Sequence, residues 1–203
     1  KEPTISTFVR ITAGRAKNFK IEIPRNTRPL TDRMKVRIFD VLGSDIANKS
    51  VLDLYAGAGS FALEALSRGA KEATLVDASK QGNIIIQRNV AHTGFLPQAD
   101  VIKSKVEDFI QKYKESDKTW DIIFMDPPYK LYNTKRVEKM ERIINDASSL
   151  LPGVKNPKTK KFKGAFIIKH PKRYPIDKLN LKYIKRVETY EFGLNSISLY
   201  IVK

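Results

Sequence analysis

The feature that most constrains the fold is an alternation of strand and helix patterns that begins at Val51. Short apolar segments rich in β-branched residues alternate with segments whose apolar residues recur at helical spacing. This alternation is typical of an α/β protein with a parallel sheet, because each parallel connection needs a crossover. The last two predicted strands are too close for a helical crossover, so we expect an antiparallel hairpin there. The seven predicted strands cover residues 51–55, 73–77, 99–103, 120–126, 164–170, 181–192 and 196–203.

The first fifty residues follow a different pattern. The segments TFVRITAG and FKIEIP alternate in polarity like two half-buried strands. A helix is predicted to begin near Thr31 or Asp32, either of which is a suitable N-cap residue. Its apolar positions at helical spacing are Met34, Ile38, Val41 and Leu42. We therefore interpret residues 1–48 as a small hairpin and helix that pack on a main domain of residues 49–203.

Composition narrows the class of protein and of partner. The chain has 203 residues, and its 38 Lys and Arg against 22 Asp and Glu give a net charge of +16. Such an excess attracts polyanions, so a nucleic acid partner is favoured over a merely lysine-rich surface. Two basic segments, 155–164 and 169–173, are candidates for phosphate contacts or for solvated loops.

The sequence also argues against cysteine-based sites, membrane spans and secretion. The chain has no cysteine, which excludes disulfides, thiolate metal sites and a cysteine nucleophile, and no metal is expected. No apolar run is long enough to span a membrane, and the segment KEPTISTF does not resemble a signal peptide. We therefore expect a cytoplasmic protein without a membrane partner.

A glycine-rich loop follows the first strand of the main domain. Asp53, Gly57 and Gly59 lie where this strand turns into its helix, and Asp77 ends the next strand about twenty residues later. Glycines at such a turn allow close approach of a ligand, and a later acid suits a ribose hydroxyl pair. The third glycine of the dinucleotide pattern is replaced by Ala62. The loop predicts an adenosine-type cofactor, and either a dinucleotide or S-adenosylmethionine satisfies it.

The motif Asp126-Pro127-Pro128-Tyr129 comes directly after the apolar strand WDIIFM. Because proline cannot join a sheet ladder, the strand must end there, at the edge where α/β proteins bind ligands. A carboxylate and the Pro127 carbonyl can accept hydrogen bonds from an amino group on a nucleobase, and Tyr129 can stack on that base. A sulfonium methyl group needs only in-line positioning, so the motif favours an amino-methyltransferase.

The segments VLDLYAGAGSFALEALSRG, TLVD and DIIFMDPPY resemble class I S-adenosylmethionine-dependent methyltransferases that act on exocyclic amines. The segments VRITAGRAKNFKIEIP and RPLTDRMKVRIFDVL further resemble the RsmD family of 16S ribosomal RNA guanine-N2 methyltransferases. The similarity runs from about Phe8 to Tyr129. It implies a Rossmann-like seven-stranded methyltransferase sheet, S-adenosyl-L-methionine as cofactor, and guanine N2 in 16S RNA as the target. The implied partner is ribosomal RNA or the assembling 30S subunit.

The resemblance also implies roles for individual residues. The catalytic set, which holds the guanine amine, is Asp126, Pro127, Pro128 and Tyr129. The cofactor set is Asp53, Tyr55, Ala56, Gly57, Gly59, Asp77, Ala78, Lys105, Val106 and Asp126, with Asp77 on the ribose and Lys105-Val106 beside the adenine. The substrate RNA set, supported also by charge and neighbouring aromatic residues, is Arg10, Arg15, Arg28, Thr31 and Arg33.

The sequence departs from the family pattern at three places. Lys17-Asn18-Phe19 replaces an Arg-Gly-Arg, Lys35-Val36 replaces an Arg-Glu, and the cation Lys105 stands where a polar or acidic residue is common. These departures affect the expected RNA and adenine contacts more than the reaction.

Other functions remain as alternatives. A DNA adenine-N6 methyltransferase uses the same motif but generally carries a separate recognition domain, and another RNA amino-methyltransferase fits equally well. A dinucleotide oxidoreductase needs a hydride-handling residue. His92 at a helix end and His170 in a basic loop are both interpreted as surface residues instead. A non-catalytic RNA-binding protein is disfavoured by the presence of both Asp77 and Asp126. A monomer is expected.

Overall fold

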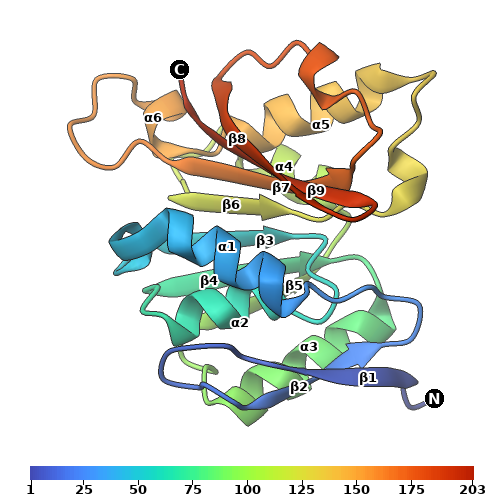
Figure 1. Cartoon of the computed structure of the whole chain (residues 1–203). Coiled ribbons are helices and arrows are strands. Elements are labelled where there is room, and N and C mark those ends of the chain that lie inside the picture. Colours follow the sequence, from blue (N-terminus) through green and yellow to red (C-terminus); the bar gives the residue numbers. More distant parts are fainter. The chain divides into compact units, whose positions relative to one another are not determined.

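The computed structural model describes residues 1–203, which form two compact units, Lys1–Val106 and Glu107–Lys203 (Figure 1). The N-terminal hairpin and helix belong to the first unit together with the glycine-rich loop. The predicted domain boundary between residues 48 and 49 stays a prediction.

The first unit contains three parallel strands in the order β5-β4-β3. Their bounds, with those of the helices between them, are β3 (Ser50–Leu54), α2 (Ser60–Ser67), β4 (Glu72–Asp77), α3 (Lys80–Thr93) and β5 (Ala99–Lys103). Val51, Leu52 and Leu54 of β3 are fully buried, as expected for a strand covered on both faces. Because the strands are parallel, their carboxyl ends lie at one edge, where the glycine-rich loop and Asp77 are found.

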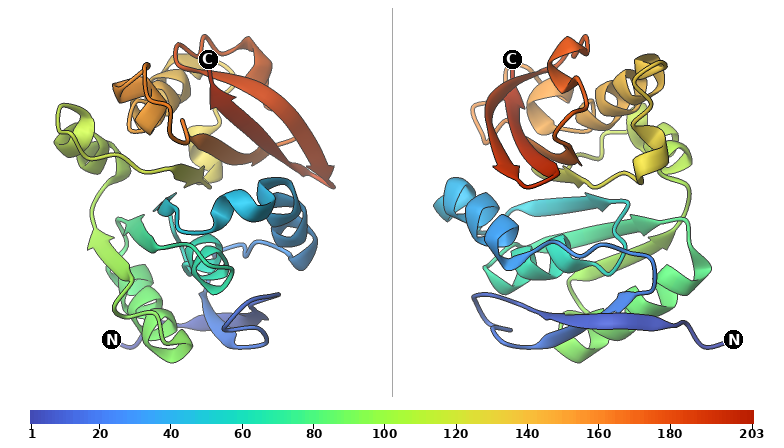
Figure 2. Two further views of the ribbon diagram at one scale, coloured as in Figure 1. Left: turned by 90° about the vertical axis from the view of Figure 1, so that its left-hand side faces the viewer. Right: turned by 45° about the vertical axis from the view of Figure 1, so that its right-hand side comes forward.

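The N-terminal extension packs against helices of the same unit. It consists of β1 (Ile5–Arg10) and β2 (Lys20–Pro24), which pair antiparallel, then α1 (Asp32–Leu42) and the short η1 (Gly43–Ile46). The hairpin lies along α3 (Figure 2), where Asn89 accepts a hydrogen bond from Glu22 N at 2.8 Å and donates one to Glu22 O at 2.9 Å. The predicted hairpin and its packing are thus confirmed.

The predicted start of α1 is also confirmed, because Thr31 is its N-cap and accepts a hydrogen bond from Met34 N at 3.2 Å. One predicted position of its apolar stripe is wrong. Val41 is exposed, and Lys35 and Phe39 lie on the buried face.

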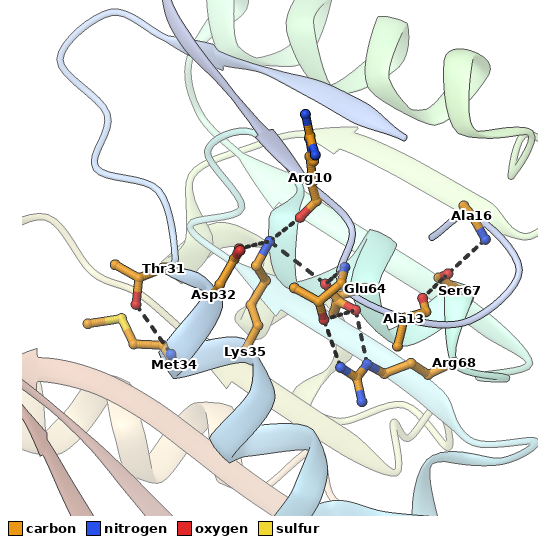
Figure 3. Close-up of polar contacts among 11 residues, drawn as sticks. Arg10, Ala13, Ala16, Thr31, Asp32, Met34, Lys35, Glu64, Ser67 and Arg68 are labelled. Atoms are coloured by element: carbon orange, nitrogen blue, oxygen red, sulfur yellow. Dashed lines mark hydrogen bonds and ion pairs between the residues drawn. The ribbon is translucent and has the colours of Figure 1, made fainter. Parts of the chain in front are cut away.

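A buried ionic cluster joins α1, the end of β1 and α2 (Figure 3). The Lys35 ammonium donates to the Arg10 carbonyl at 2.6 Å and lies 3.7 Å from the Glu64 carboxylate. Glu64 also accepts from Thr12 N at 2.9 Å and pairs with Arg68 at 2.9 Å. Because burying a charge is costly without a partner, the cluster specifies how the extension docks on α2.

The turn after β1 docks on the end of α2 through Ser67. The Ser67 hydroxyl donates to Ala13 O at 2.6 Å and accepts from Ala16 N at 2.9 Å (Figure 3). Gly14 has a φ of +84°, and a Cβ there would lie 1.8 Å from the Ser67 carbonyl oxygen. This turn therefore requires glycine for both its conformation and its close contact.

The second unit contains four strands in the order β6-β7-β9-β8. β6 and β7 are parallel, whereas β9 pairs antiparallel with both β7 and β8. The strands are β6 (Ile122–Met125), β7 (Ala165–Pro171), β8 (Ile184–Phe192) and β9 (Asn195–Val202). With the three strands of the first unit they make up the predicted seven. The expected fold class, with its C-terminal antiparallel hairpin, is confirmed.

Five helical segments accompany the strands of the second unit. They are α4 (Val106–Lys114, which begins at the last residue of the first unit), η2 (Tyr129–Leu131), α5 (Val137–Ser148), α6 (Pro152–Lys155) and η3 (Ile176–Lys178). Pro152 begins α6, because proline suits the first turn of a helix. None of the helices combines the length and apolar character that a membrane span requires.

The expected surface position of His170 is wrong. This residue lies in β7 with 2 % of its surface exposed, and its ring nitrogens contact Ser198 Oγ at 2.7 Å and Pro171 O at 2.9 Å. Lys169 beside it is also buried, so the segment 169–173 is not a basic loop throughout. His92 is exposed at the end of α3, as expected.

Candidate functional site

The glycine-rich loop has an unusual backbone. Tyr55, Gly57 and Gly59 all have positive φ, at +61°, +60° and +83°. Ala56 N donates to Val76 O at 3.0 Å, which holds the loop against β4. A tyrosine with positive φ is uncommon and marks local strain of the kind that clusters at functional sites. Sequence reasoning missed this conformation, because nothing in the residue type signals it.

Asp53 lies beneath this loop. It is 1 % exposed, and its carboxylate accepts a hydrogen bond from Ala62 N at 3.1 Å. Gly59, the N-cap of α2, has no side chain to cap the helix, so Asp53 supplies the acceptor from β3. Asp53 thus fixes the start of α2 and the loop before it. Direct contact with a cofactor stays a prediction for this residue.

Asp77 connects the end of β4 to the glycine-rich loop. Its carboxylate accepts hydrogen bonds from Gly57 N and from Ser79 N, each at 2.9 Å. An ionised carboxylate has about four acceptor positions, so lone pairs remain for a ligand with hydroxyl groups. Asp77 therefore comes together with Gly57 as the sequence predicted. Ala78, between Asp77 and Ser79, is exposed.

A cavity of about 350 Å³ opens beside this carboxylate. Gly57, Asp77, Ser79 and Ile85 line it together with residues 1–4 and with Pro24, Arg25 and Thr27. The combination of the Asp77 carboxylate, the glycine backbone at Gly57 and the apolar side chain of Ile85 fits an adenosine group. In the adjacent turn the Ser60 hydroxyl is buried without a hydrogen-bond partner. The sequence did not predict that residues 1–4, Pro24, Arg25 and Thr27 line this cavity.

Lys105 and Val106 follow β5 at the same edge of the first unit. Ser104 N donates to Asp77 O at 3.1 Å, which brings this turn next to Asp77. The Lys105 carbonyl accepts from Ser104 Oγ at 2.8 Å, its side chain is exposed, and Val106 is buried. The expected adenine contact stays a prediction for this pair.

The motif Asp126–Tyr129 belongs to the second unit and follows β6 directly. Tyr129 is exposed, and its hydroxyl donates to Asn195 Oδ1 at 2.8 Å. Tyr132 donates to the Lys169 carbonyl at 2.6 Å and packs edge-on to Tyr174. These two hydrogen bonds anchor the loop to β7 and β9. The Tyr129 ring is therefore exposed but held at its hydroxyl end.

The electrostatic environment of Asp126 involves a residue that sequence reasoning did not assign. Burial raises the pKa of the Asp126 carboxyl, and the Lys169 ammonium, 3.5 Å from Oδ2, acts against this rise. No local sequence signal marks Lys169, because its role depends on the pairing of β7 with β6.

The predicted RNA residues lie in the N-terminal extension of the first unit. Arg15 places its guanidinium 4.4 Å from the centre of the Phe95 ring and donates to Gly94 O at 3.2 Å. Thr31 caps α1 with its side chain. The side chains of Arg10, Arg28 and Arg33 are exposed. Their contacts with RNA stay predictions.

Comparison with known proteins identifies the family. The family model described as "Conserved hypothetical protein 95" matches residues 9–200. The chain belongs to this family. The resemblance to the RsmD family is confirmed by curated relatives that carry the name "Ribosomal RNA small subunit methyltransferase D".

Three curated relatives illustrate the similarity. The methyltransferase D of Buchnera aphidicola (from Acyrthosiphon pisum) is 31 % identical over 60 % of this chain and 63 % of its own length. That of Haemophilus influenzae is 33 % identical over 63 % of this chain and 67 % of its own. The "Putative rRNA methyltransferase YlbH" of Bacillus subtilis is 30 % identical over 60 % of this chain and 67 % of its own length. The match thus spans about two thirds of the length of these relatives.

Solved structures extend the similarity to nearly the whole chain. The "putative methylase HI0767" of Haemophilus influenzae has a TM-score of 0.69 and 27 % identity, covering 96 % of this chain and 98 % of its own. The "putative methyltransferase yhhF" of Escherichia coli has a TM-score of 0.74 at 23 % identity. The match covers 96 % of this chain and 97 % of that protein, and it supports the fold. The C-terminal third, where sequence similarity fades, therefore keeps the family fold.

Proposed function

We propose that this protein transfers a methyl group from S-adenosyl-L-methionine to the exocyclic N2 amine of a guanine in small-subunit ribosomal RNA. The observation that carries the proposal is Asp126 with its rigid Pro-Pro-Tyr continuation, placed directly after β6 in a member of this family. The substrate is 16S RNA, free or in the assembling 30S subunit. The protein acts on it as a monomer in the cytoplasm.

The first unit supplies the cofactor side. Asp77 accepts hydrogen bonds from the ribose hydroxyls, and the backbone around Gly57 and Gly59 holds the methionine part. Lys105 and Val106 flank the adenine. When bound, S-adenosylmethionine supplies a methyl group on a sulfonium that needs no further activation.

The second unit supplies the substrate side. The Asp126 carboxylate and the Pro127 carbonyl accept hydrogen bonds from the two amine hydrogens, which directs the nitrogen lone pair. Tyr129 stacks on the displaced base, because its hydroxyl is bonded to Asn195 while its ring is exposed. After transfer, Asp126 is placed to accept the proton that the methylated nitrogen loses.

The test is the substitution Asp126→Ala in a methyl-transfer assay on small-subunit RNA. Transfer should be abolished while S-adenosylmethionine binding is largely kept, because most of the proposed cofactor contacts come from the first unit. Asp100→Ala, at an exposed position of β5, is the matched control and should keep both methyl transfer and S-adenosylmethionine binding. Retained turnover in Asp126→Ala contradicts the assigned role.

A further inference from the structure

A lysine is buried next to the proposed catalytic carboxylate. In the parallel register of β6 and β7, Met125 pairs with Ile168, so the next residues on the two strands, Asp126 and Lys169, are neighbours. The Lys169 ammonium lies 3.5 Å from Asp126 Oδ2, and Lys169 is 6 % exposed.

The position of this lysine is not explained by packing. Burying an ammonium group is costly, and an apolar side chain at this point in β7 would continue the buried run Phe166–Ile168 without that cost. At 3.5 Å the contact is a long ion pair, beyond the usual range of an N–H···O hydrogen bond. Lys169 therefore acts on Asp126 mainly through its charge, and the carboxylate oxygens keep lone pairs for a ligand.

We propose that Lys169 is a positioning residue for methyl transfer, which keeps the Asp126 carboxylate ionised and oriented so that it accepts hydrogen bonds from the substrate amine. This inference rests on the proposed function. A protonated carboxyl group has one donor O–H and fewer, weaker acceptor positions, and it cannot take up the proton that the amine loses. The role that the proposed function assigns to Asp126 therefore favours the ionised form.

The electrostatics of the site agree with this role. Burial raises the pKa of Asp126, and Lys169 is the charged group that lowers it again. Removing the ammonium leaves only the effect of burial, so Asp126 takes up a proton at a higher pH. The Lys169 backbone has a second, separate task, because its carbonyl accepts a hydrogen bond from Tyr132 in the loop after the motif.

The test compares Lys169→Met, Lys169→Gln and Lys169→Arg with the wild type. Lys114→Met is the matched control, since Lys114, the last residue of α4, also pairs with a carboxylate, that of Asp146 at 2.9 Å. Two quantities are measured: the pH dependence of kcat/KM for methyl transfer to small-subunit RNA, and the ¹³C NMR titration of the Asp126 carboxyl in the protein without substrate.

In Lys169→Met and Lys169→Gln the acid limb of the kcat/KM profile and the Asp126 titration should both move to higher pH, so activity is lost on that limb at a pH where the wild type is still active. Lys169→Arg should restore the wild-type pH dependence and the wild-type Asp126 titration, and Lys114→Met should leave both unchanged. An unmoved Asp126 titration in the folded Met and Gln variants would overturn the inference. Absence of transfer by the wild type would overturn the proposed function instead, since the carboxyl titration needs no substrate.

Discussion

The backbone N–H of Gly57 donates a hydrogen bond to the Asp77 carboxylate at 2.9 Å. This bond joins the glycine-rich loop after β3 to the end of β4. The same carboxylate accepts from Ser79 N, the N-cap residue of α3. One side chain thus orders both turns that line the cavity, and it leaves lone pairs for a ligand.

Asp77→Ala should therefore weaken S-adenosylmethionine binding by about 10- to 100-fold, the usual loss for a hydrogen bond to a charged group. Isothermal titration calorimetry measures the effect. Asp100→Ala, on the adjacent strand β5, should keep the wild-type Kd. Equal affinities of Asp77→Ala and wild type would contradict the assignment of Asp77 to the cofactor.

The docking of the β1–β2 turn on α2 can be tested with two glycines of almost equal φ. Gly14 has φ +84° and Gly94 has φ +82°, but an added Cβ meets the Ser67 backbone at Gly14 and nothing within 4 Å at Gly94. Gly94→Ala should cost about 1–2 kcal/mol for its conformation alone. Gly14→Ala should cost about 1–3 kcal/mol more because of the clash. Urea unfolding gives both values, and equal losses would show that the close contact is unimportant.

The buried cluster around Glu64 should contribute strongly to stability. Glu64→Gln removes the charge that both Lys35 and Arg68 face, at nearly unchanged volume. We expect a loss of about 3–5 kcal/mol in the free energy of unfolding, as for other broken buried pairs. Glu2→Gln breaks the exposed pair with Arg88 and should cost about 0–1 kcal/mol. Similar losses in the two variants would disprove a special role for the cluster.

His170 should make stability depend on pH. Burial lowers its pKa, Arg186 adds to this, and Asp177 and the Pro171 carbonyl oppose it. The unfolded chain takes up the proton near pH 6.5, whereas the folded chain does so only at lower pH. The contribution of neutral His170 is therefore complete above about pH 6.5 and is lost as the pH falls below it.

His170→Gln should reduce the drop in unfolding free energy between pH 7 and pH 5. Denaturant titrations at both pH values measure the drop. The matched control is His92→Gln, at an exposed position on α3, which should keep the wild-type drop. A drop as large in His170→Gln as in the wild type would contradict the prediction.

The fold could be predicted because its signals are local. Apolar runs of strand length, helical spacing between them and a connection too short for a crossover determine the strand types and the final hairpin. The relation of Asp77 to Gly57 was also predictable, since both follow parallel strands that end at one edge. The glycine-rich loop, the acid and the Asp-Pro-Pro-Tyr motif all lie at the ends of strands, as expected.

What the sequence did not reveal depends on contacts between distant segments. Lys169 and His170 are polar residues in a buried strand, and their partners are Asp126, directly after β6, and Ser198 in β9. Lys35 occupies the buried face of α1 because Glu64 lies opposite. Charge and polarity alone predicted a surface position for such residues, because a buried partner has no signature in the local sequence.

The most direct test of the account is the chemical identity of the methylated product. Purified protein and labelled S-adenosylmethionine are incubated with small subunits that lack their native guanine-N2 methylation, with naked 16S RNA and with duplex DNA, followed by nucleoside analysis. We expect labelled N2-methylguanosine from the subunit or its RNA, and no label in DNA. Labelled N6-methyladenine from DNA, or no product from any substrate by a protein that binds the cofactor, would contradict it.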